Sequence, residues 1–131
     1  MSGNVETIQG IYAAFGRGDV AAILSAASDD VRWHVIGSSA YPLHKPFHGK
    51  AGGAEFFTAI AANEDFSEFA PISFHDAGDH VFVLGRAVYK MKTTGKGVAT
   101  DFIHIWTLKD GKVASFREFS DTAQVVAAYA A

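Results

Sequence analysis

Apolar residues near the start of the chain recur with the 3.6-residue period of an α-helix. The pattern predicts a first helix over residues 4–16 and, with Asp19 as its N-cap, a second helix over residues 20–27. A third helix is predicted over residues 50–62, and Asp121 is expected to cap a short last helix. The apolar stripe of the first helix consists of Val5, Ile8, Ile11, Tyr12 and Phe15.

Runs rich in Val, Ile and Phe predict strands between and after these helices. The first strand covers residues 31–36, and glycines and prolines make residues 37–48 an irregular loop. Helices grouped on one side of an antiparallel meander form an α+β fold, which is the fold class that we expect. The four later strands are predicted near residues 66–77, 80–92, 97–109 and 112–120.

The strongest local signal is the pair Asp110-Gly111, which is typical of a two-residue type I′ hairpin turn. Such a turn predicts that Ile103 lies opposite Glu118 in the hairpin. Glu118 would then stand on an apolar face, where loss of hydration raises the pKa of a carboxyl group and makes it a candidate acid or base. The neighbours expected on this face are Ile103, Ile105 and Phe116.

Composition narrows the possible classes of protein. The 131 residues suit a single domain over residues 1–131, and 49% apolar residues with 11 Phe suit a packed core or a cavity lined by rings. A net charge of −3 without a basic stripe argues against nucleic acid as a ligand. Residues 1–20 resemble neither a signal peptide nor a membrane span, so a cytoplasmic protein without a membrane partner is expected.

No motif indicates a metal or a cofactor. The chain has no cysteine, which excludes a thiolate nucleophile and a zinc–thiolate site. His44 and His48 are four residues apart, but they fall in a loop with prolines and have no third ligand at suitable spacing. Neither a phosphate-binding glycine loop after a strand nor a Gly-x-Ser-x-Gly motif is present.

The element order, with the segments IYAAFGRGDVAAILSAASDDVRW, PFHG and FIHIWTLKDGKVASFREFSDT, resembles the nuclear-transport-factor-2-like superfamily. The resemblance is closer to its SnoaL-like and ketosteroid-isomerase-like branch. It implies a cone-shaped, strongly curved antiparallel sheet wrapped around three to four helices, with a deep apolar pocket for a small hydrophobic ligand. It also implies a homodimer through the convex face of the sheet, which is where the predicted turn places His104 and Trp106 with Arg117.

The resemblance assigns some positions of this chain to roles in the family. His34 stands where the catalytic base, an Asp, is usual, whereas Ile11 and Ile103 replace the two groups that hold the oxyanion. Because isoleucine donates no hydrogen bond, the usual steroid-isomerase machinery is excluded. Epoxide-hydrolase-like relatives carry an acid at the position of Glu118, and SnoaL-like cyclases use an acid near the chain end, here Glu118 or Asp121.

The predicted catalytic residues are therefore His34, Glu118 and Asp121, and each has a plainer reading. His34 is otherwise a polar residue on the wetter face of an edge strand, Glu118 a strand-end carboxylate in water, and Asp121 an N-cap. A three-residue turn with a bulge would shift the hairpin by one residue, so His104 stays a candidate. The predicted substrate-binding residues are Tyr12, Trp33, Phe57, Arg86, Ile103, His104 and Phe116.

These residues lead to three hypotheses of function. The first is an enzyme without cofactor, of isomerase, cyclase or hydrolase and dehydratase type, that moves protons on a small hydrophobic molecule. The second is a module that binds such a molecule without chemistry, which the two missing oxyanion donors favour. The third is an assembly domain that works through the convex face.

Overall fold

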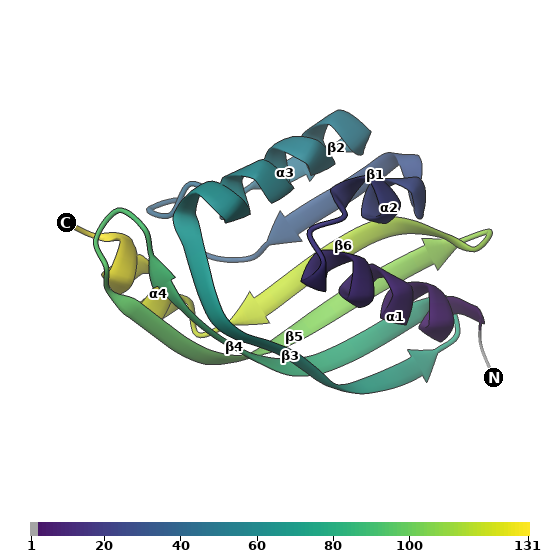
Figure 1. Ribbon diagram of the computed structural model, residues 1–131. Helices are drawn as coiled ribbons and strands as arrows, with labels where there is room; N and C mark the ends of the chain where they lie inside the picture. The colour runs from purple at the N-terminus through teal and green to yellow at the C-terminus, as the bar shows by residue number, and fades with distance from the viewer. Residues whose placement is uncertain (1–2) are drawn as a thin grey trace.

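A strongly curved sheet of six strands carries helices on its inner face (Figure 1). The computed structural model describes residues 3–131. None of the helices within these residues has the length and apolar character that a membrane crossing requires. The elements are α1 Gly3–Gly16, α2 Val20–Ser25, β1 Ala27–Val35, β2 Pro46–His48, α3 Gly49–Asn63, β3 Glu64–Ala77, β4 His80–Met91, β5 Gly97–Lys109, β6 Lys112–Ser120 and α4 Thr122–Tyr129.

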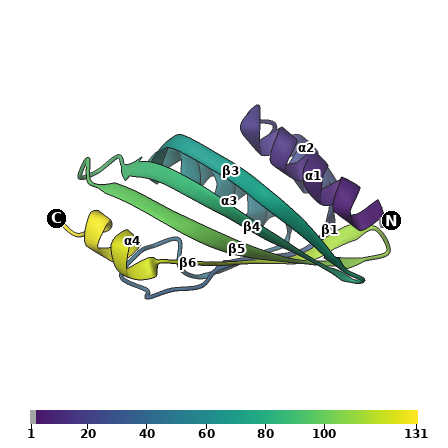
Figure 2. The same ribbon diagram turned by 90° about the horizontal axis from the view of Figure 1, so that it is seen from below.

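The strands follow the order β2-β1-β6-β5-β4-β3. The predicted meander from β3 to β6 is antiparallel throughout, whereas β1 joins β6 in parallel, so the sheet is mixed. Figure 2 shows the outer face of the sheet toward the viewer, with α3 behind it and α1 beside β3. The predicted α+β class with a curved, mostly antiparallel sheet is confirmed.

Local signals placed most elements correctly. The carboxylates of Asp19 and Asp121 accept hydrogen bonds from the N–H groups of Ala22 and Gln124, so both residues are N-caps as predicted. The loop prediction over residues 37–48 missed the short strand β2, which pairs with β1. A three-residue strand has too little pattern of its own, and only its partner strand defines it.

The hairpin between β5 and β6 has the predicted turn but not the predicted register. Asp110 and Gly111 both have positive φ, at 52° and 77°. A β-bulge just after the turn then shifts the pairing by one residue. As a result His104, and not Ile103, lies opposite Glu118.

The physical reason for the bulge is the spacing of two apolar residues on β6. Val113 and Phe116 are both buried, but three residues apart in a regular strand they would point to opposite faces. The bulge turns both inward, and Glu118 follows Phe116 onto the inner face. The prediction that His104 and Trp106 lie on the convex face is therefore wrong, since each is 3% exposed inside the sheet.

A substitution of Gly85 on β4 tests how tightly this curved sheet is packed. A Cβ at this position would overlap the ring of Phe102 and lie 2.6 Å from the carbonyl oxygen of Ala70. We expect Gly85→Ala to lower the free energy of unfolding by about 1–3 kcal/mol. Gly97→Ala is the matched control, because the nearest atom to its Cβ would be 3.9 Å away. Urea unfolding measures both, and equal effects would contradict the proposed close packing.

Candidate functional site

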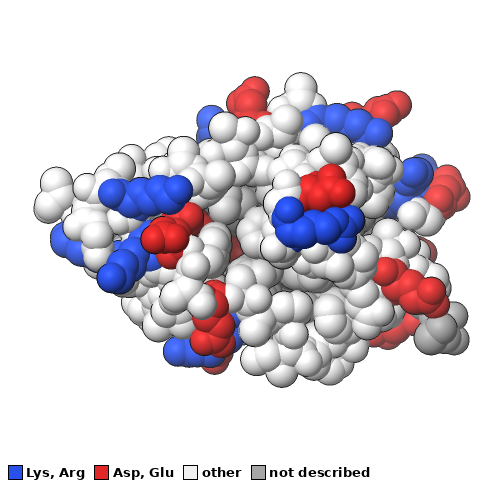
Figure 3. All heavy atoms as spheres, viewed as in Figure 1, with Lys and Arg blue, Asp and Glu red and all other residues white. Residues whose placement is uncertain are grey.

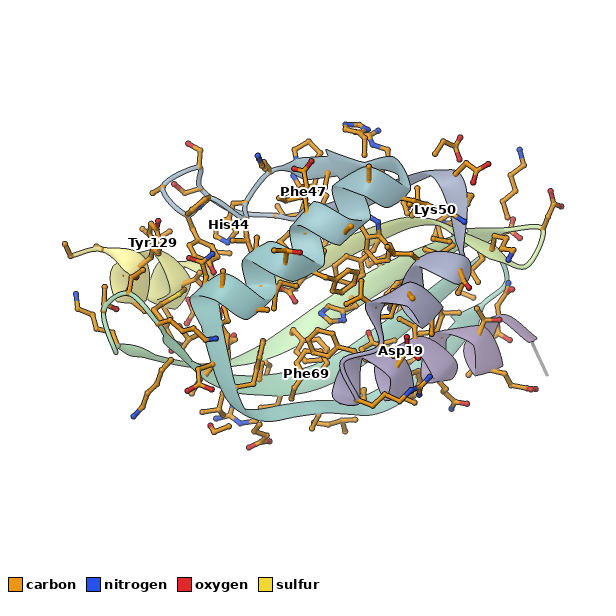
Figure 4. The ribbon with its side chains drawn as sticks, turned by 45° about the horizontal axis from the view of Figure 1, so that its top comes forward. Asp19, His44, Phe47, Lys50, Phe69 and Tyr129 are labelled. Carbon is orange, nitrogen blue, oxygen red and sulfur yellow. The ribbon has the colours of Figure 1, made fainter. Side chains whose placement is uncertain are left out.

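The inner face of the sheet, α1 and α3 enclose a cavity of about 70 Å³. This inner cavity shares lining residues with a larger groove of about 800 Å³ between α1, α3 and β3, which we call the outer groove. Figure 4 shows Phe69 projecting from β3 toward this region. The residues common to both spaces are Tyr12, Phe15, Phe57, Ile60, Glu64, Phe66 and Phe69.

Aromatic rings form most of the wall where the two spaces meet. Phe69 stacks on Phe102 with 5.2 Å between ring centroids, and Phe15 lies 4.9 Å from Phe69. Flat rings packed in this way present broad apolar surfaces with few polar atoms. Such a wall favours a flat, apolar ligand over a charged or highly hydrated one.

A chain of hydrogen bonds crosses the inner cavity from α1 to β6. The hydroxyl group of Tyr12 lies 2.5 Å from His104 Nδ1, and His104 Nε2 lies 2.7 Å from Glu118 Oε1. The indole N–H of Trp106 donates to the Tyr12 oxygen at 3.0 Å. Helix α1 supplies the phenol, β5 the imidazole and indole, and β6 the carboxylate, so the first helix and the last hairpin together build the site.

Hydrogen-bonding capacity determines which groups carry the protons. An ionised Glu118 only accepts, so Nε2 of His104 carries a hydrogen, and Nδ1 of the neutral ring then accepts the Tyr12 O–H. Burial raises the pKa of Tyr12 far above its usual value, while the bond from Trp106 acts in the opposite direction. The resting phenol is therefore neutral, and it releases its proton only as it gains another. This arrangement is suited to relaying a proton from a ligand to His104.

A second polar group lies at another part of the same cavity. The Tyr41 hydroxyl donates to Glu64 Oε2 at 2.6 Å, and His44 Nδ1 donates to the carbonyl oxygen of Ser38 at 2.8 Å. Burial raises the pKa of Glu64 to about 8, the bond from Tyr41 opposes this shift, and the nearby Glu118 carboxylate adds to it. Burial and the nearby Glu118 thus favour the protonated form of this carboxyl group.

The structure brings together six of the residues predicted for the site. All six line the inner cavity, and they come from five different elements. Trp33 contributes only apolar surface to the cavity, because its indole N–H lies against Gly53 of α3. This N–H group is the one buried side-chain donor within residues 3–131 that has no hydrogen-bond partner. The six residues are Tyr12, Trp33, Phe57, His104, Phe116 and Glu118.

His34 does not enter the cavity. Trp33 and its buried neighbours point inward from β1, so His34 points to the other face and lies beside Arg117 of β6. Burial, followed by the charges of Arg32, Arg117 and His44, lowers its pKa. His34 is therefore not a residue of the pocket, and His104 supplies the imidazole beside Glu118 instead.

Three further predicted residues lie outside the cavity. Ile103 is 44% exposed on the outer face, because His104 beside it points inward, and the bulge places Phe119 rather than Glu118 opposite it. Arg86 pairs at 3.5 Å with Asp101 across the outer face of β4 and β5. Asp121 is occupied as the N-cap of α4. The prediction that these three residues line the pocket is therefore wrong.

Sequence reasoning missed Tyr41, His44 and Glu64 as lining residues. Glu64 had one available signal, since it stands two residues before Phe66 and shares its face of a strand. Tyr41 and His44 come from a loop, and no period in the sequence reveals which way they point. Among the described residues, 3–131, no group of three or more His, Asp or Glu side chains is arranged to hold a metal ion.

The SnoaL-like domain family matches residues 8–116, and the chain belongs to this family. An NTF2-like protein of unknown function from Burkholderia pseudomallei has a similar structure, with 29% identity, TM-score 0.90 and full coverage of both chains. TerC, co-crystallised with polyporic acid, is 32% identical with TM-score 0.85, over 97% of this chain and 98% of TerC. A comparison with curated proteins found no match.

Tyr12→Phe tests the hydrogen-bond chain through stability. Loss of the hydroxyl group leaves the Trp106 N–H and His104 Nδ1 without their partner, so we expect a loss of about 1–3 kcal/mol in the free energy of unfolding. Tyr129→Phe is the control, since no residue within 3–131 hydrogen-bonds to that hydroxyl group, and it should cost less than about 0.5 kcal/mol. Chemical unfolding compares the two, and a Tyr12 effect no larger than the control would contradict the network.

Proposed function

We propose that this protein is a cofactor-independent acid/base enzyme that moves a proton on a small, flat, hydrophobic molecule. The observation that carries the proposal is the relay of Tyr12, His104 and Glu118 inside an apolar cavity. In many enzymes an imidazole, held in place by a carboxylate, activates a nucleophile or a base. The buried phenol, imidazole and carboxylate of this site lie in the same order.

The proposed step begins at a ligand C–H bond next to a carbonyl group. The Tyr12 oxygen takes that proton as its own proton passes to His104 Nδ1, and the C–H electron pair becomes the C=C bond of an enolate. Glu118 holds the imidazole in place and stabilises the imidazolium that forms. Return of the proton to the same or another carbon completes an exchange or an isomerisation.

The surroundings support an apolar ligand. On the face of the molecule in Figure 3, positive and negative side chains are interspersed over a largely uncharged surface. Rings line the inner cavity and the outer groove. TerC was co-crystallised with polyporic acid, and this supports a small organic molecule as the ligand of a related pocket.

A second candidate function is ligand binding without chemistry. One observation favours it: both ring nitrogens of His104 already have partners within the protein, as a structural polar network would require. Binding with no proton transfer would then be the whole function. The two candidates differ in whether a bound ketone exchanges its hydrogen atoms.

Hydrogen exchange in D₂O tests the enzyme hypothesis. We expect the protein to accelerate deuterium uptake beside the carbonyl group of flat aromatic ketones such as α-tetralone, followed by mass spectrometry. His104→Gln should slow this uptake by about 10²–10⁴-fold, because it removes the group that accepts the Tyr12 proton. His75→Gln, at an exposed position on β3, should leave the rate unchanged. Tight binding without any exchange by the unmodified protein would favour the second candidate.

We also propose that the protein forms a homodimer through the convex face of the sheet. This face exposes Ile72, Leu84 and Ile103 from three adjacent strands, at 69%, 43% and 44% of their surface. Exposed apolar side chains gathered on one surface are typical of an interaction site. Residues from the inner face, including Trp106, take no part in this proposal.

Leu84→Glu tests the convex-face dimer. A charge buried at the centre of the contact should convert dimers to monomers, which light scattering with size-exclusion chromatography detects. Thr58→Glu adds the same charge at an exposed position of α3 and should leave the mass unchanged. Dimers of the Leu84 variant that are as stable as those of the control would place the interface elsewhere.

A further inference from the structure

We infer that Glu64 is the general acid of the site and donates its proton to a carbonyl oxygen of the bound ligand. The inference rests on the proposed function and names a group that the relay of Tyr12, His104 and Glu118 lacks. That relay removes a proton, but it provides no acid for the charge that develops on the ligand oxygen.

The position of Glu64 is the first support. It begins β3 and lines the inner cavity, the outer groove and a third cavity of about 30 Å³. Glu118 lines the inner and the third cavity as well. Glu64 and Tyr12 both line the inner cavity and the outer groove, so a ligand that spans the two spaces contacts the acid and the relay together.

The hydrogen bonding of Glu64 is the second support. Tyr41 donates to Oε2, and no residue within 3–131 hydrogen-bonds to Oε1. The bond from Tyr41 holds the carboxyl group in one orientation while one oxygen stays open toward the cavities. A protonated carboxyl group fixed in this way has its proton available for a ligand.

Burial and the nearby Glu118 keep Glu64 neutral, against the opposing effect of the bond from Tyr41. Tyr41 comes from the loop before β2, Tyr89 from β4 and Glu118 from β6, and both burial and Glu118 disfavour its ionised form. Among residues 3–131, no lysine or arginine lines the three cavities. The other titratable groups on the inner cavity are Tyr12, His44 and His104.

The resulting step is balanced in protons and electrons. As Tyr12 takes the C–H proton and passes its own to His104, the C–H pair becomes a C=C bond and the C=O π pair moves to oxygen. That oxygen receives the proton of Glu64, which leaves a neutral enol, a carboxylate at Glu64 and an imidazolium at His104. The ligand class is thus an aromatic or polycyclic ketone with a C–H bond next to its carbonyl group.

Glu64→Gln, with Glu68→Gln on the exposed side of the same strand as its control, tests the inference. Deuterium uptake by α-tetralone is measured from pH 6 to pH 9. In the unmodified protein the rate should fall above about pH 8, where Glu64 loses its proton. Glu64→Gln should lower the rate at pH 7 by about 10²-fold and remove that alkaline fall, because glutamine has no proton to transfer. The Glu68 variant should behave as the unmodified protein.

Thermal unfolding gives a reading that is independent of turnover. The pKa of folded Glu64 lies above that of the unfolded chain, so protonation stabilises the fold at low pH and this stabilisation is lost as the pH rises toward 8. The melting temperature of Glu64→Gln should match that of the unmodified protein near pH 5 and exceed it at pH 9. Equal melting temperatures at both pH values would overturn the assignment of Glu64 as a neutral acid.

The two proposals fail in different ways. If the unmodified protein produces no exchange, the proposed function and the acid role that rests on it both fall. If His104→Gln stops the exchange while Glu64→Gln exchanges at the unmodified rate with the same pH profile, the relay stands and the inference is overturned. Binding of polyporic acid, measured by calorimetry, should change less than about threefold in Glu64→Gln if its cavity is intact.

Discussion

One extra residue in β6 decides where the chemistry of this protein lies. The bulge after the Asp110-Gly111 turn allows Val113 and Phe116 to point inward together, and it places Glu118 opposite His104. Because side chains alternate along a strand, a regular β6 would put Glu118 on the outer face instead. The imidazole would then be buried without its carboxylate partner, which would be costly.

The polar network survives in an apolar interior because its members satisfy one another. His104 is stacked on Phe102 with 4.0 Å between the ring centroids, while its two nitrogens are bonded to Tyr12 and Glu118. Trp106 adds a donor to the Tyr12 oxygen. A network of this kind is rigid, since each group fixes the orientation of the next. The rings around it keep water out and strengthen each electrostatic interaction.

The cavity combines three features: the relay of Tyr12, His104 and Glu118, a wall of aromatic rings, and a second carboxyl group, that of Glu64. Phe69 and its neighbouring rings line the passage between the inner cavity and the outer groove. Glu118 and Glu64 share that space but have different environments: one carboxyl group is paired with an imidazole and the other with a phenol. Two carboxyl groups with different partners provide the separation of base and acid that proton transfer requires.

Local patterns in the sequence determined the helices, the long strands, the two Asp caps and the two-residue turn, because each depends on residues close together in the chain. They also identified Tyr12, Glu118 and His104 as candidates. Only the tertiary structure decided which imidazole meets the carboxylate, because that pairing depends on strand register, and only it brought Tyr12 to His104 from 92 positions away. The bulge reverses the face of the β6 residues that follow it, whereas His34 and Ile103 lie outside because their strand neighbours Trp33 and His104 point inward.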